Sequence, residues 1–427
     1  MRAFKKGPDY IDAAWLRWAS GAAARNLDTW LMGFDGAVNS FAWHAIPEGL
    51  NLIEGNRGLY DGSDAQGTHS TAELAKALQA PVILVIDATK VTRTAAALVL
   101  GCQELDPDLW IAGVILNQVG GNRHEQVLRE AIEAVCRIPV VGVIRHAAAD
   151  ALLPTRHLGL VTPQEYADRD ALERSILDLT AGGLELDRLL EISRRAPPLC
   201  PSSPSPRDAP NGSGLRVGYL NDSAFTFYYP ENLDALRAAG AELVPISALT
   251  AGSLPCGLDG LYIGGGFPET HAQALSANAG FLASLRQAAC EGLPIYAECG
   301  GLMLLSRAIR WQGREYPMAG GLPFAVEVCA TPQGHGYSEL LVDAANPFFP
   351  PGTRIRGHEF HYSRIVPERE LPETACAVLR GTGCFARRDA VIANNVWASY
   401  THLHALATPE WAAGFLAAAR RCALVMA

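Results

Sequence analysis

Cys299 has the sequence surroundings of a nucleophile. It lies in segment 293–305 (LPIYAECGGLMLL), where an apolar run meets two glycines and a second apolar run follows. This pattern predicts a short buried strand, a tight turn and a helix, an elbow that holds a nucleophile at the carboxyl edge of a sheet. Backbone N–H groups and a helix N-terminus beside the sulfur would favour the thiolate, the reactive form of cysteine. The alternative is a buried structural cysteine.

A thiol nucleophile needs a base, and four histidines downstream could supply it: His358, His361, His402 and His404. His402 follows a strand-like stretch, and a cysteine with a distant histidine is common where the two meet only in the fold. At each histidine, the alternative is a structural role. The glycine run 264–266, with Gly265 and Gly266, and the N–H of Gly300 would form the oxyanion hole.

A second group of polar residues follows predicted strands nearer the N-terminus. Glu54, Asp87 and Asn117 each end an apolar run, and ligands of parallel sheets bind beyond the carboxyl ends of the strands. We therefore expect one site there, with a helix cap or turn as the alternative for each residue. Glu54 and Asp61, with glycines between them, are typical oxygen ligands for Mg²⁺ and its phosphates.

Two α/β domains are needed to position these residues. In the first, Val/Ile/Leu-rich strands alternate with helices, which predicts a parallel sheet covered on both faces. The predicted strands are 51–54, 81–87, 111–117 and 139–144, and the helices are 71–78, 92–104 and 123–136. The second has strands at 215–220, 242–246 and 260–263, strand-like segments at 357–363 and 399–404, and helices at 231–239, 279–291 and from 409. Segment 195–214, rich in Pro, Ser and Gly, is predicted to be a linker between domains 1–194 and 215–427.

Composition excludes several classes of protein. A net charge of −9 over 427 residues argues against a nucleic-acid binder. No apolar run approaches the length of a membrane helix, and a signal-peptide core is missing. The ten cysteines are scattered without a CxxC pair, so neither a zinc site nor a disulfide framework is indicated, and a reduced cytoplasm is expected.

Five motifs occur together and in a familiar order. They are 7–12 (GPDYID), 54–62 (EGNRGLYDG), 264–269 (GGGFPE), 297–301 (AECGG) and 399–404 (SYTHLH). Together they resemble the cobyrinic acid a,c-diamide synthase family over nearly the whole chain.

The resemblance implies a glutamine amidotransferase that depends on ATP and Mg²⁺ and has two active sites. In the C-terminal domain, similar to class I glutaminases, Cys299 would attack the side-chain amide of glutamine and His402 would activate the thiol. The N-terminal domain, similar to dethiobiotin synthetase, would phosphorylate a carboxylate of a tetrapyrrole. Asp9, Asp61 and Glu54 match family positions for Mg²⁺–ATP handling and substrate activation. Ammonia would then displace the acyl phosphate.

The chain also departs from the family pattern. The family begins with a strand and a Gly-rich phosphate-binding loop, which we expect to be encoded upstream of Met1. The position of the glutamate in the His-x-Glu of class I glutaminases is taken by His404, so the group that orients His402 is left open. Lys5-Lys6 and Asn56-Arg57 are more similar to relatives that amidate sirohaem, so the substrate could be cobyrinate or sirohaem. A non-catalytic tetrapyrrole-binding protein and a bare glutaminase are further alternatives, and a homodimer is possible.

Overall fold

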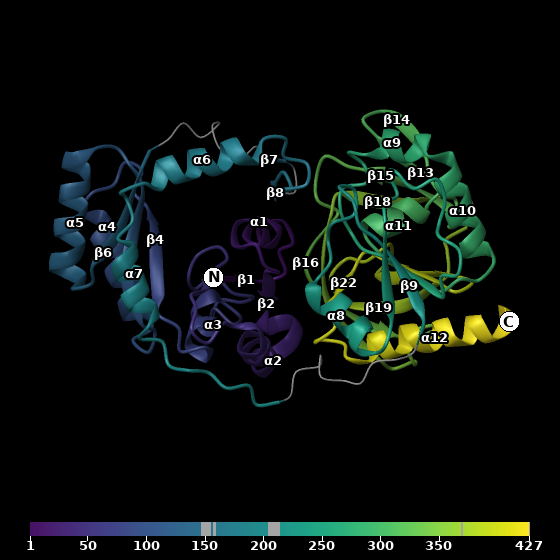
Figure 1. Ribbon diagram of the computed structural model, residues 1–427, viewed down its shortest axis with the longest axis horizontal. Coiled ribbons are helices and arrows are strands. Elements are labelled where there is room, and N and C mark those ends of the chain that lie inside the picture. Colours follow the sequence, from purple (N-terminus) through teal and green to yellow (C-terminus); the bar gives the residue numbers. More distant parts are fainter. Residues whose placement is uncertain (147–154, 157–158, 204–213, 369, 427) are drawn as a thin grey trace. The chain divides into compact units, whose positions relative to one another are not determined.

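The structure is a computed structural model that describes residues 1–427 except 147–154, 157–158, 204–213, 369 and 427 (Figure 1). Its internal contacts divide the chain into two compact units, described separately here. The first comprises Met1–Thr29 and Phe34–Ser203, and the second comprises Trp30–Gly33 and Pro204–Ala427. Residues 204–213 of the predicted linker lie outside the described residues, so the domain limits 194/195 and 214/215 stay a prediction.

The first unit contains the predicted parallel strands, but in two separate three-stranded sheets. One sheet has the order β2-β1-β3, with β1 (Arg2–Lys6), β2 (Arg25–Leu27) and β3 (Asn51–Glu54). The other has the order β4-β5-β6, with β4 (Val82–Asp87), β5 (Ile111–Val119) and β6 (Val140–Arg145). All pairs in both sheets are parallel. A short antiparallel pair, β7 (Thr155–Arg156) and β8 (Gly159–Leu160), completes the strands described in this unit.

Helices α1 to α5 connect the six parallel strands, and α6 and α7 follow β8. Their bounds are α1 (Ile11–Ser20), α2 (Thr29–His44), α3 (Thr71–Ala77), α4 (Thr94–Leu105), α5 (Asn122–Cys136), α6 (Arg169–Thr180) and α7 (Leu186–Ser193). Helix α5 shows why the sequence folds this way. Its buried residues Leu128, Ile132 and Cys136 recur every fourth position, which makes one apolar face along the helix. That face packs in one cluster with Val114 and Leu116 of β5, so the helix covers the β4-β5-β6 sheet.

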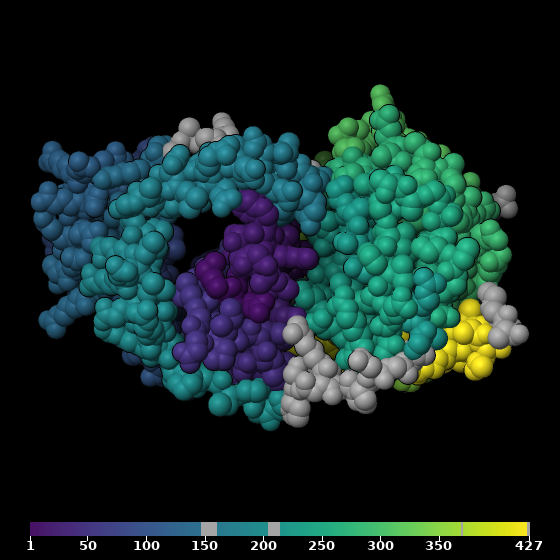
Figure 2. Space-filling model, in the orientation of Figure 1, coloured from purple at the N-terminus to yellow at the C-terminus, as the bar shows by residue number. Residues whose placement is uncertain are grey.

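Each sheet of the first unit ends in an edge strand with an exposed apolar side chain. Among the described strands, β3 pairs with β1 and β4 pairs with β5. Leu52 on β3 is 47% exposed and Val85 on β4 is 59% exposed. In the space-filling view, this unit is hollowed between α6 and the N-terminal elements (Figure 2). A single continuous sheet was predicted, and its division leaves these two edges open.

The second unit is built on a ten-stranded mixed sheet, in the order β10-β9-β11-β12-β21-β20-β19-β16-β17-β22. Its first five strands are parallel and its remaining pairs are antiparallel. The strands are β9 (Arg216–Leu220), β10 (Glu242–Ile246), β11 (Gly260–Ile263), β12 (Ile295–Glu298), β16 (Gly334–Val342), β17 (Arg354–His361), β19 (Thr374–Arg380), β20 (Arg388–Ala393), β21 (Val396–Ser399) and β22 (His402–Leu403). The predicted α/β character is confirmed for the parallel half, whereas the antiparallel half was not predicted.

A second, four-stranded sheet, β14-β13-β15-β18, belongs to the same unit. Its strands are β13 (Ala308–Trp311), β14 (Arg314–Pro317), β15 (Phe324–Val328) and β18 (Ser363–Pro367). The helices of the unit are α8 (Pro230–Ala238), α9 (Ala272–Ala277), α10 (Ala279–Cys290), α11 (Gly300–Leu305) and α12 (Glu410–Met426). No helix in the described part of the chain is long and apolar enough to cross a membrane.

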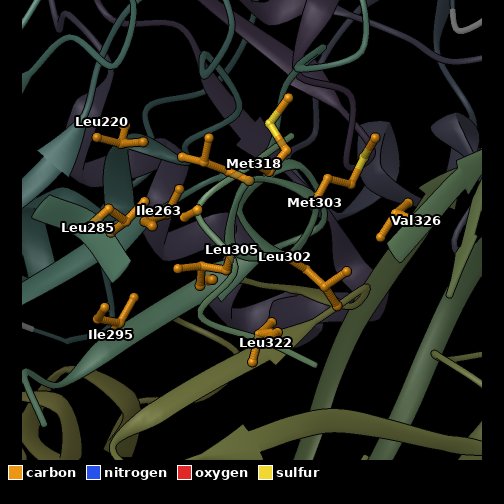
Figure 3. Packing of buried hydrophobic residues seen from close by; sticks show 14 of the residues in the cluster. Leu220, Ile263, Leu285, Ile295, Leu302, Met303, Leu305, Met318, Leu322 and Val326 are labelled. Carbon is orange, nitrogen blue, oxygen red and sulfur yellow. The ribbon is translucent and has the colours of Figure 1, made fainter. Parts of the chain in front are cut away.

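Alternation along the central strands places helices on both faces of the large sheet. Ile295 and Ala297 of β12 pack in a cluster with residues of α9, α10 and α11. Tyr296, between them, packs in a second cluster with residues of α8 and α12. Helix α11 is buried on all sides, and Leu302, Met303 and Leu305 point from it into the surrounding core (Figure 3). Both the strand before Cys299 and the helix after it are therefore fixed by packing.

Candidate active site

Cys299 occupies the predicted strand-to-helix elbow, between β12 and α11. Its backbone has φ 46° and ψ −94°, a conformation that residues other than glycine adopt only under constraint. The two following glycines permit the turn, because a Cβ on Gly301 would lie 2.5 Å from the carbonyl oxygen of Ile263. A strained residue on a rigid elbow is typical of an active-site nucleophile.

Strand pairing brings His402 to the same edge of the sheet. The N–H of Cys299 donates a hydrogen bond of 2.7 Å to the carbonyl oxygen of Ser399, the last residue of β21. His402 follows three residues later, is 2% exposed, and pairs with His358 across β22 and β17. Their imidazole rings stack with centroids 5.0 Å apart.

The glycine loop after β11 packs directly against this histidine. A Cβ on Gly265 would lie 2.5 Å from Cε1 of His402, so a larger residue would displace the ring. Gly266 has φ 156°, and a Cβ there would lie 2.1 Å from the carbonyl oxygen of Ala224. A Cβ on Gly300 would lie 3.1 Å from the Gly266 nitrogen, which places the loop beside the start of α11. The structure thus gathers Gly265, Gly266 and Gly300 around the elbow, as an oxyanion hole requires.

Gly264, the first glycine of the run, has a different role. The N–H of Gly264 donates to the Tyr228 hydroxyl at 2.8 Å, and the Gly265 carbonyl accepts from the N–H of Phe227. These bonds anchor the loop on segment 225–229. The Gly264 N–H is occupied in this structure, so the oxyanion donors we retain are the N–H groups of Gly265, Gly266 and Gly300.

The elbow does not favour the thiolate by itself, so that prediction was wrong. Burial raises the pKa of Cys299 well above its usual 9.0, and the charges of Glu269 and Glu298 raise this pKa further. A backbone N–H from Gly300 acts in the opposite direction without outweighing them. Because burial disfavours the charged sulfur, formation of the thiolate depends on a base that takes the proton.

Two of the other candidate histidines are held in structural contacts. The His361 ring stacks on Tyr400 with centroids 3.7 Å apart, and its Nδ1 lies 2.7 Å from the Ser363 carbonyl oxygen. His404 accepts a hydrogen bond at Nδ1 from the N–H of Leu406, and its Nε2 lies 3.6 Å from a carboxylate oxygen of Glu231. These contacts support the structural alternative for both.

In the first unit, Lys5 forms the centre of a group of charges at the end of the β2-β1-β3 sheet. Its ammonium is 2.8 Å from an Asp12 carboxylate oxygen and 3.1 Å from Oε1 of Glu54, and it donates to the Gly55 carbonyl. Strand register explains the pairing, because Lys5 on β1 lies opposite Glu54 on β3. Burial alone would lower the pKa of Lys5, but Asp12, Glu54 and Asp9 together raise it above 10.5.

Asp9 belongs to the same group. Its Oδ1 accepts the N–H of Asp12 at 2.8 Å, and Asn26 fixes the loop by donating to the Gly7 and Asp9 carbonyls. Burial raises the pKa of Asp9, and the charge of Asp12 raises it further. Burial also raises the pKa of Glu54, although the charge of Lys5 opposes this effect. These partly desolvated carboxylates would be stabilised by an additional cation.

Asp61, Asp87 and Asn117 lie in different surroundings. Asp61 accepts the N–H of Gly58 and so closes its own loop. Asp87 and Asn117 are partners on the adjacent strands β4 and β5, in the sheet that does not contain Glu54. The Thr89 side chain and N–H donate to Asp87 and lower its pKa. Asp87 is the last residue of β4 as predicted, whereas Asn117 lies two residues before the end of β5, and Glu54 ends a strand of the other sheet.

Comparison with known proteins decides the family. Residues 27–161 match the CobQ/CobB/MinD/ParA nucleotide binding domain, and residues 216–410 match the CobB/CobQ-like glutamine amidotransferase domain. A cobyrinate a,c-diamide synthase from Magnetococcus marinus is 43% identical over 96% of this chain and 89% of its own length. The chain belongs to the cobyrinate a,c-diamide synthase family.

Other members of the cobyrinate a,c-diamide synthase family are similar over comparable lengths. The enzymes so named from Dehalococcoides mccartyi and Archaeoglobus fulgidus are 40% and 37% identical, each over 97% of this chain and 91% and 90% of their own lengths. A solved glutamine amidotransferase covers 48% of this chain and 98% of its own at 22% identity, with a TM-score of 0.36, too low to carry weight.

Sequence reasoning missed two charged residues of these sites in this family member. The sequence indicates Lys5 only as a variant of a motif, although a lysine near the end of a strand and shortly before two aspartates is a signal for a buried ion pair. Glu298 was read as part of the AECGG motif without a role. Its position directly before the nucleophile gives no signal in sequence, because its partner is distant along the chain.

Proposed function

We propose that this chain catalyses the ATP-dependent amidation of the a and c acetate carboxylates of a tetrapyrrole such as cobyrinate, with glutamine as the nitrogen donor. The supporting observation is the strained Cys299 elbow beside His402, in a chain of the cobyrinate a,c-diamide synthase family. Two reactions are combined: glutamine hydrolysis in the second unit and carboxylate activation in the first.

In the glutaminase reaction, Cys299 is the nucleophile. His402 takes the thiol proton, and the sulfur attacks the side-chain carbonyl carbon of glutamine. The developing oxyanion accepts hydrogen bonds from the N–H groups of Gly265, Gly266 and Gly300. The proton on His402 passes to the leaving nitrogen, so ammonia departs, and water then hydrolyses the thioester to glutamate.

In the synthetase reaction, a carboxylate must first acquire a leaving group. Transfer of the γ-phosphoryl group of ATP to the acetate oxygen gives an acyl phosphate, and ammonia displaces phosphate to form the amide. We assign Asp9 and Asp61 to substrate activation and Asp87 and Asn117 to nucleotide binding, and these assignments stay predictions. Asp9 is the best supported of the four, because it lies beside the Lys5 group of charges.

Mg²⁺ fits the chemistry of Glu54. Burial raises the pKa of this carboxyl even with Lys5 beside it, so a cation would favour its ionised form. Mg²⁺ is usually held by one or two carboxylates together with substrate phosphates, and when bound it would screen the charges that meet in phosphoryl transfer. Glu54 is the residue we expect to hold it. A cytoplasmic location and a homodimer remain parts of this proposal.

Assays with glutamine and with free ammonia as separate nitrogen sources test whether the glutaminase and synthetase reactions take place at two sites. Cys299→Ala should abolish amidation that depends on glutamine and leave amidation with free ammonia at the wild-type rate. The measurement is the amount of amidated tetrapyrrole, determined by mass spectrometry with each nitrogen source. Retention of glutamine-dependent amidation by a folded Cys299→Ala protein would show that Cys299 is not the nucleophile.

Substrate identity requires a direct comparison. Incubation with cobyrinate should give two successive mass changes of one amide each, and incubation with sirohaem should give little product. The reverse result would favour the sirohaem alternative, which the segments 5–6 and 56–57 suggest. Glutamine hydrolysis without any amidation, including with ammonia, would instead support a bare glutaminase.

A further inference from the structure

We propose that Glu298, the residue directly before the nucleophile, is the carboxylate that orients His402. This inference rests on the glutaminase reaction proposed above. Its Oε2 lies 3.6 Å from Nδ1 of His402, and its side chain is fully buried. The usual position for such a carboxylate, two residues after the histidine, holds His404 in this chain.

The fold explains how one strand supplies both residues. Side chains alternate along β12, so Tyr296 and Glu298 face the side of the sheet covered by α8 and α12. Cys299 then turns away at the elbow into the opposite cluster. Glu298 pairs in register with Ser399, so its carboxylate lies beside segment 399–404, which carries His402.

Glu298 belongs to a hydrogen-bond network that also binds segment 399–404. Its Oε1 accepts the N–H of Leu403 at 3.1 Å, and its Oε2 accepts the hydroxyl of Tyr262 at 3.0 Å. Asn232 of α8 donates to the Tyr262 oxygen and to the Leu403 carbonyl, and accepts the N–H of Ala405 at 2.7 Å. The carboxylate therefore has a fixed position relative to the imidazole.

This arrangement sets the tautomer that the reaction needs. With Nδ1–H directed at Glu298, the lone pair of His402 is on Nε2, the ring atom that can accept the thiol proton. Nε2 lies at the end of the ring that faces the glycine loop, 3.4 Å from where a Cβ on Gly265 would be. A distance of 3.6 Å is long for a hydrogen bond, as is common for catalytic pairs without a bound substrate.

The negative charge of Glu298 has a second effect. Once the thiol proton reaches His402, the imidazolium lies between Glu298 and the thiolate, where the carboxylate stabilises it. The titratable groups around Cys299 and His402 include Glu298 of β12, Tyr262 of β11, His358 of β17, His404, Glu269 and Asp389 of β20. His358 stays neutral, because burial lowers its pKa far below 6.5.

Glu298→Gln isolates this role because the two side chains have the same shape. The amide oxygen can still accept the Leu403 N–H, and the amide NH₂ would then face Nδ1 of His402. The ring would have to accept there and carry its proton on Nε2, which is the wrong tautomer for a base. We expect the rate of glutamine hydrolysis to fall at least about tenfold, with little change in KM.

The pH dependence of Cys299 alkylation by iodoacetamide separates the two roles, because it would not change if Glu298 had only a structural role. The rate is followed against pH by mass spectrometry of the peptide that contains Cys299. The rate rises with pH as the thiolate forms, and the pH at half of the maximal rate is the midpoint. If Glu298 acts through His402, loss of the carboxylate should move this midpoint to higher pH, since the imidazolium that accompanies the thiolate is no longer stabilised. If Glu298 acts only as a negative charge near the sulfur, its loss should move the midpoint to lower pH, and the proposal is overturned.

Two matched variants complete the experiment. Glu269→Gln removes a charge that raises the pKa of Cys299, so the midpoint of its alkylation rate should move to lower pH, opposite to Glu298→Gln. Glu231→Gln removes the carboxylate beside His404 and should leave the midpoint in place. A shift to higher pH in Glu231→Gln but not in Glu298→Gln would assign the orienting role to the His404 pair instead.

The outcome is separable from the proposed function. Suppose that Cys299→Ala loses glutaminase activity, but Glu298→Gln keeps the wild-type rate of glutamine hydrolysis and the wild-type alkylation midpoint. This result would contradict only the role proposed for Glu298. Glutaminase activity that survives Cys299→Ala would remove the proposed nucleophile. A thermal unfolding transition of the second unit in Glu298→Gln that matches the wild type would show that the variant is folded.

Discussion

Cys299 and Ser399 are joined by a backbone hydrogen bond of 2.7 Å between the ends of two adjacent parallel strands. This bond continues the β12–β21 ladder one step beyond the last strand residue, into the elbow. It holds Cys299 against Ser399, which precedes His402 by three residues, although Cys299 and His402 are far apart in the sequence. The precision of the site therefore depends on whatever fixes segment 399–401.

Asp389 of β20 fixes that segment. Its side chain is fully buried, and its two oxygens accept from the N–H groups of Tyr400 and Thr401 and the hydroxyls of Ser399 and Thr401. They also accept from the thiol of Cys384 and the N–H of Ala390. Among the described residues, this is the carboxylate that binds the segment before His402.

We predict that Asp389→Ala lowers the free energy of unfolding by about 2–4 kcal/mol, because several buried donors lose their acceptor. Glutamine hydrolysis should fall as well, since segment 399–401, which positions His402, loses the acceptor that holds it in place. Urea denaturation followed by tryptophan fluorescence measures the first effect. Asp343→Ala is the control: Asp343 pairs with Arg388 of the same strand at the surface, and its loss should cost less than about 1 kcal/mol.

The glycine loop gives a prediction about activity rather than stability. In Gly265→Ala, the new methyl group would lie 2.5 Å from Cε1 of His402, so the imidazole must move from the position it has here. We expect glutamine hydrolysis to fall at least about a hundredfold, because misplacing a catalytic group by about 1 Å has an effect of that size. Steady-state kinetics of glutamate release measures it.

The control for this variant is Gly252→Ala. No atom lies within 4 Å of a Cβ at that position, so the substitution should leave glutamate release unchanged. Ammonia-dependent amidation should survive in both variants. A Gly265→Ala enzyme with normal glutamate release would mean that the ring position does not limit the reaction.

The sequence predicted the parts of the fold that are encoded locally. The elbow at Cys299, the helix at 71–78 and the strands around 51–54, 81–87 and 260–263 follow from runs of apolar residues and from glycines. The antiparallel half of the large sheet was not predicted, because β16 pairs with β19 although segment 343–373 separates them, and because buried and exposed residues do not alternate regularly along these strands. Local patterns do not encode which strands pair.

The same distinction applies to the site. Cys299 could be identified because its chemistry depends on neighbours in sequence. Glu298 and Asp389 could not be assigned roles, since their partners come from β11, β21, β22 and the two residues between β21 and β22. The raised pKa of Cys299 also escaped prediction, because it results from burial by the whole unit rather than from the glycines beside it.

The last prediction concerns Lys5 and the pH dependence of stability. The folded-state pKa of Lys5 lies above 10.5, so titration of Lys5 itself leaves its stabilising effect complete below pH 10.5 and removes it as the pH rises through the folded value. Glu54 and Asp9 have raised pKa values, so their ionisation opposes folding as the pH rises above their usual values of 4.5 and 3.8. At neutral pH, the charge of Lys5 offsets part of the destabilisation that the ionised Glu54 and Asp9 cause.

Lys5→Met should therefore lower the free energy of unfolding by about 1–3 kcal/mol at pH 7.5, a range reduced for the partial exposure of Glu54 and Asp12. Near pH 4 the difference from wild type should shrink, because protonation removes the carboxylate charges that Lys5 balances. Chemical denaturation at the two pH values measures both effects. Lys76→Met, which breaks a more exposed pair with Asp106, should cost less than about 1 kcal/mol at pH 7.5. An equal loss for Lys5→Met at both pH values would show that Lys5 stabilises the unit by packing and not by its charge.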